Sequence, residues 1–250
     1  MRTKAILAIL VAALIMPCLA SAQIGGIFKQ APNNKPGNSN ISAAENEWVA
    51  KGTAGGVDYV MTGRINHDDY DKTQTSTVSF SRIPETLEEF LELQKELGVE
   101  PQGAVALQVI AFEMYRRDKA VGTEAIRANN TQTNFNDCLR QLKEKLGKDP
   151  GYAQPYIVAA LMMGASPSNG YQPRKPYTVS LRVSPAVEYK ESQLLGGTVL
   201  YLQLFSQGWS MNWRGVDVVK PYDSDYYLVC NCPSFYVGCA PMRGQWTPID

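Results

Sequence analysis

The stretch Pro101–Arg117, PQGAVALQVIAFEMYRR, decides the fold because its apolar residues are not confined to one stripe. Between Ala104 and Tyr115 they cover nearly the whole circumference of a helix. A helix that is apolar on every side is either buried in a core or spans a membrane. This stretch is too short for a span and runs straight into the charged residues 116–119. It therefore predicts a buried core helix.

Helices are predicted on both sides of this stretch. Thr86 followed by Glu89 forms a capping box, which opens a helix that ends at Gly98. Another helix is predicted from about Asn134 to Gly147. Its apolar residues recur at the spacing of one buried face, so that Cys138 faces the core: Phe135, Cys138, Leu139, Leu142 and Leu146.

Strands are predicted before and after the helices. Segments 57–65 and 77–83 form a strand pair around the polar turn 66–72, and segment 177–184 alternates apolar with polar residues. Segment 198–205 is apolar on both faces and predicts a central strand, and two more strands follow, the first interrupted at Gly215. This order predicts an α+β fold, in which a central buried helix with flanking helices packs on an antiparallel sheet.

The beginning of the chain indicates export. Arg2 and Lys4 precede an apolar run from residue 5 to 15, and Ala20-Ser21-Ala22 fits a cleavage site. We expect a signal peptide over residues 1–22, cut after Ala22, and a protein in the periplasm, at the cell surface or outside the cell. A lipoprotein signal at Cys18 is the rival interpretation, but Pro17 fits it poorly. A retained anchor helix fits poorly because the run is short.

The remainder of the chain divides by composition. Residues 23–47 are polar and rich in Asn, Pro, Gly and Ser, which predicts a flexible tether. Residues 48–250 are then a single α+β domain with an aromatic- and cysteine-rich tail at 222–250. Acidic and basic residues are equal in number over the whole chain, with 24 of each and no basic run. This balance argues against a nucleic-acid partner, and no stable membrane span is expected after cleavage.

Three parts of the sequence carry a family resemblance. They are Pro84–Phe90, the pair Ala106-Leu107 with Tyr115, and GASPSNGYQPRKPYTV at 164–179. Together they resemble a family of bacterial proteins known only as a domain of unknown function. The likeness covers roughly residues 84–220 and implies no activity or catalytic residue. The tail after Tyr227 lies outside it and is expected to be a local addition.

The sequence offers little support for catalysis. His67 is the only histidine, it sits in the polar turn, and no Gly-x-Ser-x-Gly elbow is present, so we predict no catalytic nucleophile system. The acids around His67 do not have the spacing of a calcium loop. Phosphate-binding and dinucleotide fingerprints are also missing, and no cofactor is predicted. Paired carboxylates stay open as an alternative, because glycosidases need only two acids: Glu188, Asp217, Asp223 and Asp225 are candidates.

Four cysteines remain after signal cleavage: Cys138, Cys230, Cys232 and Cys239. An even number in an exported protein predicts at least one disulfide, with the pairing open. Buried free thiols are the plain alternative. A zinc site would need all four, and both the tight Cys-Asn-Cys spacing and the oxidising compartment disfavour it, so no metal is predicted.

Aromatic residues crowd the end of the chain. Flat rings with polar neighbours suit glycans, peptides or protein surfaces. The binding candidates are Tyr171, Tyr177, Trp209, Trp213, Tyr222 and Tyr227. The leading hypothesis is an exported, non-catalytic binding or interaction module of the bacterial envelope, with an envelope protein, peptide or glycan as partner. The alternatives are a secreted carboxylate-dependent hydrolase acting on glycans, and a structural envelope component that self-associates. These rings can also simply fill the core.

Overall fold

The computed structural model describes residues 47–66, 69, 72–148, 153–183, 190–208, 212–242 and 246–249. The predicted signal peptide, its cleavage site after Ala22 and the tether up to residue 46 lie outside this part of the chain. The same is true of His67 and Trp209. Among the described residues, no helix has both the length and the apolar character needed to cross a membrane.

One antiparallel sheet contains all the named strands, in the order β1-β2-β3-β4-β6-β7-β8, with β5 added beside β6. β3 and β4 are neighbours although the helices separate them in sequence, and they pair from Gln74↔Val183 to Phe80↔Tyr177. The helices are thus an insertion into a simple meander. The strands are β1 Val49–Ala54, β2 Val57–Thr62, β3 Gln74–Phe80, β4 Tyr177–Val183, β5 Lys190–Ser192, β6 Gly197–Phe205, β7 Trp213–Pro221 and β8 Leu228–Asn231.

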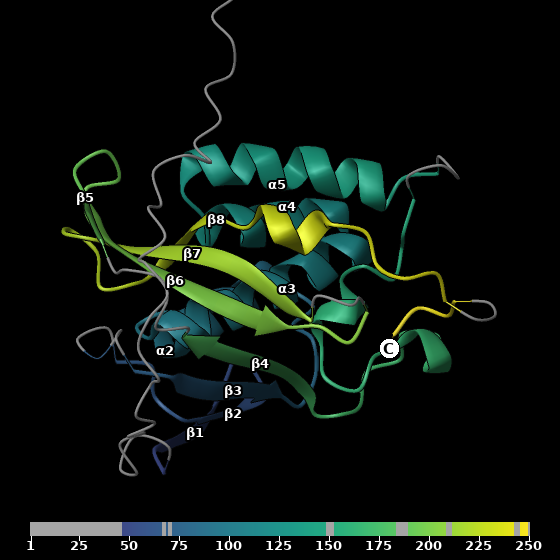
Figure 1. Ribbon diagram of the computed structural model, residues 1–250, viewed down its shortest axis with the longest axis horizontal. Helices are drawn as coiled ribbons and strands as arrows, with labels where there is room; N and C mark the ends of the chain where they lie inside the picture. The colour runs from purple at the N-terminus through teal and green to yellow at the C-terminus, as the bar shows by residue number, and fades with distance from the viewer. Residues whose placement is uncertain are drawn as a thin grey trace, which may run out of the picture.

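Four α-helices cover one face of this sheet: α2 Leu87–Leu97, α3 Pro101–Arg117, α4 Lys119–Ala128 and α5 Gln132–Lys145. Figure 1 shows α3 directly behind the strands and α5 on the outside of the helical layer. Every residue from Pro101 to Tyr115 is buried, which confirms the predicted core helix. The predicted α+β architecture, with helices packed on an antiparallel sheet, is also confirmed.

The helix termini follow from local hydrogen bonds. Thr86 caps α2 as predicted, because its hydroxyl accepts the Glu89 backbone N–H at 3.2 Å. The Glu89 carboxylate turns back to the start of the helix, where it pairs with Arg82, accepts from the Glu85 backbone N–H at 2.7 Å and interacts with the backbone of Thr86. The Asp118 carboxylate caps α4, a helix that the sequence patterns did not indicate, at the junction with α3.

Two strand predictions need correction. β6 is not buried on both faces: its leucines at 200, 202 and 204 are buried, whereas Tyr201, Gln203 and Phe205 are half-buried on the face opposite the helices. β7 runs unbroken through Gly215, where the Tyr201 ring of β6 packs on the backbone and a side chain would clash. This glycine therefore makes room for a neighbouring ring and does not end a strand.

Candidate functional site

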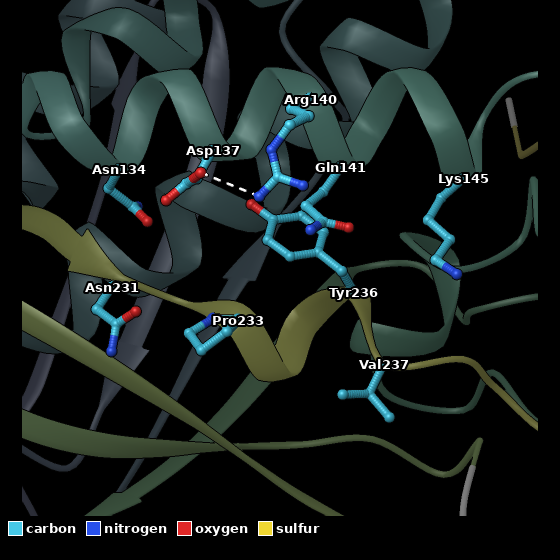
Figure 2. Close-up of a pocket in the computed structure, with 9 residues that line it drawn as sticks. All are labelled: Asn134, Asp137, Arg140, Gln141, Lys145, Asn231, Pro233, Tyr236 and Val237. Carbon is cyan, nitrogen blue, oxygen red and sulfur yellow. Dashed lines mark hydrogen bonds and ion pairs between the residues drawn. The ribbon is translucent and has the colours of Figure 1, made fainter. Parts of the chain in front are cut away.

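A cleft of about 300 Å³ lies between α5 and the chain that follows β8. Figure 2 shows side chains of α5 facing side chains of the tail, which includes the short 3-10 turn η5 Pro233–Tyr236. The lining residues are Asn134, Asp137, Arg140, Gln141 and Lys145 on the helix, and Asn231, Pro233, Tyr236 and Val237 on the tail.

The amphipathic character of α5 places its polar side chains in the cleft. Phe135, Cys138 and Leu142 face the core, and the polar residues that directly precede them in sequence form the neighbouring stripe that lines the cleft. Opposite, η5 is held to the core by Phe235, whose ring packs edge-on against Phe112 of α3 with centroids 6.4 Å apart. The cleft therefore has two walls that are both fixed to the same core.

Charges in the cleft are nearly balanced. Asp137 and Arg140 form an ion pair at 3.1 Å, drawn as a dashed line in Figure 2, and both side chains are well exposed. Lys145 lies 4.0 Å from Glu144. The remaining polar groups are amides and a phenol, which both donate and accept hydrogen bonds. This lining suits a polar ligand without net charge.

A buried row of polar side chains connects the core helix to the cleft wall. The side-chain carbonyl of Gln108, on α3, accepts hydrogen bonds from the side-chain amides of Asn129 at 2.9 Å and Asn130 at 2.7 Å. The side-chain carbonyl of Asn130 in turn accepts a hydrogen bond from the side-chain amide of Asn134 at 2.5 Å. Asn134 lines the cleft, so its orientation is set from the centre of the protein.

Two of the predicted disulfide candidates meet directly behind the cleft. The sulfur atoms of Cys138 on α5 and Cys232 after β8 are 3.8 Å apart, and both residues are fully buried. The Tyr236 hydroxyl lies 3.4 Å from the Cys232 sulfur. Burial alone raises the pKa of the Cys232 thiol, but hydrogen bonds from Cys138, Tyr236 and Asn134 outweigh it and lower that pKa. The hydrogen bond with Cys232, together with burial, raises the pKa of Cys138.

The other two cysteines lie elsewhere. The Cys230 sulfur contacts the Asp217 backbone carbonyl at 3.4 Å, and burial raises the pKa of its thiol. Burial also raises the pKa of Cys239 to about 11, in the surroundings of Tyr171 and Arg214. The four cysteines among the described residues are unbonded thiols in this structure. Within its described part, no three or more potential metal ligands gather, so the sulfurs do not form the zinc arrangement considered above.

The aromatic candidates do not form one surface. Tyr171, Tyr177 and Tyr227 are buried, and Trp213 is half-buried on the open face of the sheet, against Phe205. Tyr222 is the exposed one among those described, at 65%.

The burial of Tyr171 has a structural cause. Its ring stacks on Tyr156 at 4.6 Å, and its hydroxyl donates to the Ala240 carbonyl at 2.6 Å. It therefore joins the loop that precedes β4 to the tail instead of facing a ligand.

The carboxylate candidates are also dispersed. Asp223 and Asp225 are exposed, and Glu188 lies outside the described residues. Asp217 is buried, and its carboxylate accepts one hydrogen bond, from Asn231 at 2.8 Å. Burial raises the pKa of this carboxyl, and the bond from Asn231 only partly offsets that effect. Asn231 lines the cleft, so Asp217 stands immediately behind its tail wall.

Sequence reasoning missed most of the cleft. The polar stripe of α5 is indistinguishable in sequence from an ordinary solvated helix face, and only Tyr236 belonged to the aromatic crowding noted in the tail. The remaining signal was the Asn-Cys-Pro turn at 231–233, which ends β8 and turns the chain toward α5.

A protein-family model, described as a domain of unknown function (DUF6935), matches residues 82–243, more than half of the chain. The chain belongs to the DUF6935 family. The match starts just before α2 and includes α2 to α5, β4 to β8 and the cleft, whereas β1, β2 and β3 precede it. The tail after Tyr227 was expected to lie outside the family, which was wrong, because the match extends past Cys239.

Comparison with curated proteins found no match to this DUF6935 chain, and comparison with solved structures found none either.

Proposed function

We propose that this DUF6935 protein is an exported, non-catalytic binding module of the cell envelope, and that its cleft holds a short neutral segment of glycan. The observation that supports the proposal is the lining of the cleft: three amide side chains, one phenol and an internally paired Asp137–Arg140 couple. Sugar hydroxyls both donate and accept hydrogen bonds, as amides do. The remaining charged side chain of the lining, Lys145, lies 4.0 Å from Glu144 just outside the cleft, which partly neutralises it.

A glycan fits this cleft better than a peptide does. Peptide grooves use sheet edges for backbone pairing or apolar pockets for side chains. Here the apolar lining is limited to Pro233 and Val237, with the ring of Tyr236 behind them. The volume of about 300 Å³ is at the low end for small-molecule sites, which limits the contact to one or two sugar rings.

The proposal is non-catalytic because the lining holds no poised nucleophile or acid–base pair. Asp137 is the carboxylate among the lining residues; its side chain is exposed and already paired with Arg140 at 3.1 Å, and no second carboxylate lines the cleft beside it.

Calorimetric titration with neutral hexasaccharides tests the proposal. The panel contains maltohexaose, cellohexaose, xylohexaose and chitohexaose, with a hexapeptide of uncharged residues as the comparison ligand. The double variant D137A/R140A removes the Asp137–Arg140 ion pair of the cleft. Its matched control is E92A/K95A, which deletes another exposed i,i+3 ion pair, on α2. We expect the cleft variant to bind at least about tenfold more weakly, the effect of losing one or two hydrogen bonds to charged groups, and the control to bind normally.

If the protein binds the peptide and none of the glycans, the glycan assignment is wrong. If the two double variants bind with equal affinity, the cleft is not the binding site. Export is tested separately, by N-terminal sequencing of the protein recovered from a periplasmic or extracellular fraction. We expect the mature chain to begin at Gln23, next to the predicted cleavage site. Recovery in the cytosol with Met1 retained would contradict export.

One observation favours the alternative of a glycan hydrolase. Asp217 is a buried carboxyl with a raised pKa, directly behind the cleft residue Asn231, and raised carboxyl pKa values are typical of general acids. Reducing-sugar release from the same hexasaccharides decides between the two functions. Turnover by the wild type that D217N abolishes would establish the hydrolase, and binding without turnover supports the module.

A further inference from the structure

The meeting of Cys138 and Cys232 is a property of the fold and not of local sequence. Cys138 is on the core side of α5, Cys232 follows β8, and 94 positions separate them along the chain. Their sulfurs nevertheless lie 3.8 Å apart, with both residues fully buried. Neither Cys230 nor Cys239 has a sulfur neighbour within hydrogen-bonding contact among the described residues.

The two sulfurs are in direct non-bonded contact, with no atom between them. A disulfide requires sulfurs about 2.05 Å apart, so the two sulfurs must approach by about 1.8 Å for the bond to form. The two thiols also differ from cysteines that only fill an apolar core, because polar atoms of Asn134, Asn130 and Tyr236 contact their sulfurs. Tyr236 and Asn134 can retain contacts to sulfur after the two thiol hydrogens are lost.

We propose that Cys138 and Cys232 form a disulfide in the exported protein, while Cys230 and Cys239 remain thiols. The two thiols together lose two protons and two electrons, and one S–S bond forms. The acceptor is an external disulfide, of a thiol–disulfide oxidoreductase or of oxidised glutathione, which is reduced to two thiols. Because both sulfurs are buried in the folded chain, this exchange takes place during folding, before the tail closes over α5.

The bond would join the two walls of the cleft. Asn134 lies one turn before Cys138 on α5, and Tyr236 lies one turn after Cys232, and both line the cleft. Oxidation thus fixes the tail to the helix directly behind the proposed ligand. The pairing itself does not depend on the proposed glycan function, and its test needs no ligand.

Thiol counting on exported protein, unfolded without reductant, tests the pairing. An intact mass first shows whether residues 1–22, with Cys18, have been removed; if they remain, each count rises by one. A duplicate sample is treated with oxidised glutathione during refolding. We expect two free thiols in the wild type, three in C138S, three in C232S, and one each in C230S and C239S.

The double variant C230S/C239S keeps the test decisive if C138S or C232S fails to fold. It retains only the proposed pair, and we expect no free thiol in it. Tryptic mapping should show peptide 128–140 linked to peptide 215–243, and the link should disappear on reduction. Two free thiols in this double variant after both treatments, or four in the wild type, would overturn the proposal. A pairing of Cys230 with Cys239 would instead give one thiol in C138S and three in C230S.

Discussion

Two glutamines on α3 allow a matched test of what holds the core together. Gln102 and Gln108 are both fully buried on the same helix. The Gln108 carbonyl accepts from Asn129 and Asn130, whereas neither polar atom of the Gln102 amide has a partner among the described residues. Methionine has nearly the same length and shape as glutamine and has no amide. We expect Q108M and Q102M to change stability in opposite directions.

The magnitudes follow from counting hydrogen bonds. Q108M leaves one N–H of Asn129 and one of Asn130 unpaired, because the other N–H of each is used by Ala104 or Ile126. At about 1–3 kcal/mol for each buried unpaired donor, partly offset by the added apolar group, Q108M should destabilise by about 2–5 kcal/mol. Q102M removes an unpaired buried amide, and should stabilise by about 1–2 kcal/mol.

Urea unfolding of both variants measures these differences from the shift in midpoint at unchanged slope. In thermal melts, each kcal/mol should shift Tm by about 2–4 °C for a chain of this size. Equal destabilisation by Q102M and Q108M would refute the reasoning, because it would mean that glutamine shape matters at both positions and hydrogen-bond partners do not. If Q108M has the same free energy of unfolding as the wild type, the buried row of polar side chains does not contribute measurably to stability.

Three further outcomes are expected. G103A should destabilise the protein by about 1–3 kcal/mol in chemical unfolding, because the added Cβ would lie 2.6 Å from the Leu97 carbonyl carbon. This loss is expected although alanine favours helices more than glycine does. Unchanged stability would mean that α2 can shift away at no cost. Y171F should lose about 1–2 kcal/mol in the same assay, since the Ala240 carbonyl loses its donor. The folded-state pKa of Asp217 is raised, so wild-type stability should fall as pH rises from the unfolded pKa through the folded one. Unfolding curves of D217N should lack this fall, and parallel pH profiles would contradict it.

The sequence predicted those parts of the fold in which one local pattern dominates. The apolar circumference of Pro101–Tyr115 and the alternation of Tyr177–Val183 each allow one structure, and both predictions are confirmed. α4 was missed because its sequence, KAVGTEAIRA, buries only small residues and one isoleucine and has no wide apolar stripe. The faces of β6 were misjudged because half-buried aromatic residues on the open side of a sheet read as core residues in a sequence.

The candidate site depended on long-range packing and could not be predicted in the same way. Tyr171 and Trp213 are both aromatic residues in polar surroundings, yet one is buried by a ring stack and the other lies on an open sheet face. No local pattern distinguishes them. The approach of Cys138 to Cys232 likewise follows from the parallel contact between Asn130 and Val229, which brings the start of α5 beside β8.

The buried polar row explains how a cleft wall made of tail residues can be part of the core. If the tail were held by apolar contacts alone, it could separate from α5 with little effect on α3. Here Val229 exchanges backbone hydrogen bonds with Asn129 and Thr131, and Asn134 connects through Asn130 to Gln108. Detaching the tail would therefore leave donors and acceptors unpaired inside the helical layer, at about 1–3 kcal/mol each. Such a penalty couples β8, α5 and α3 into one cooperative unit, so the cleft retains its shape before any ligand arrives.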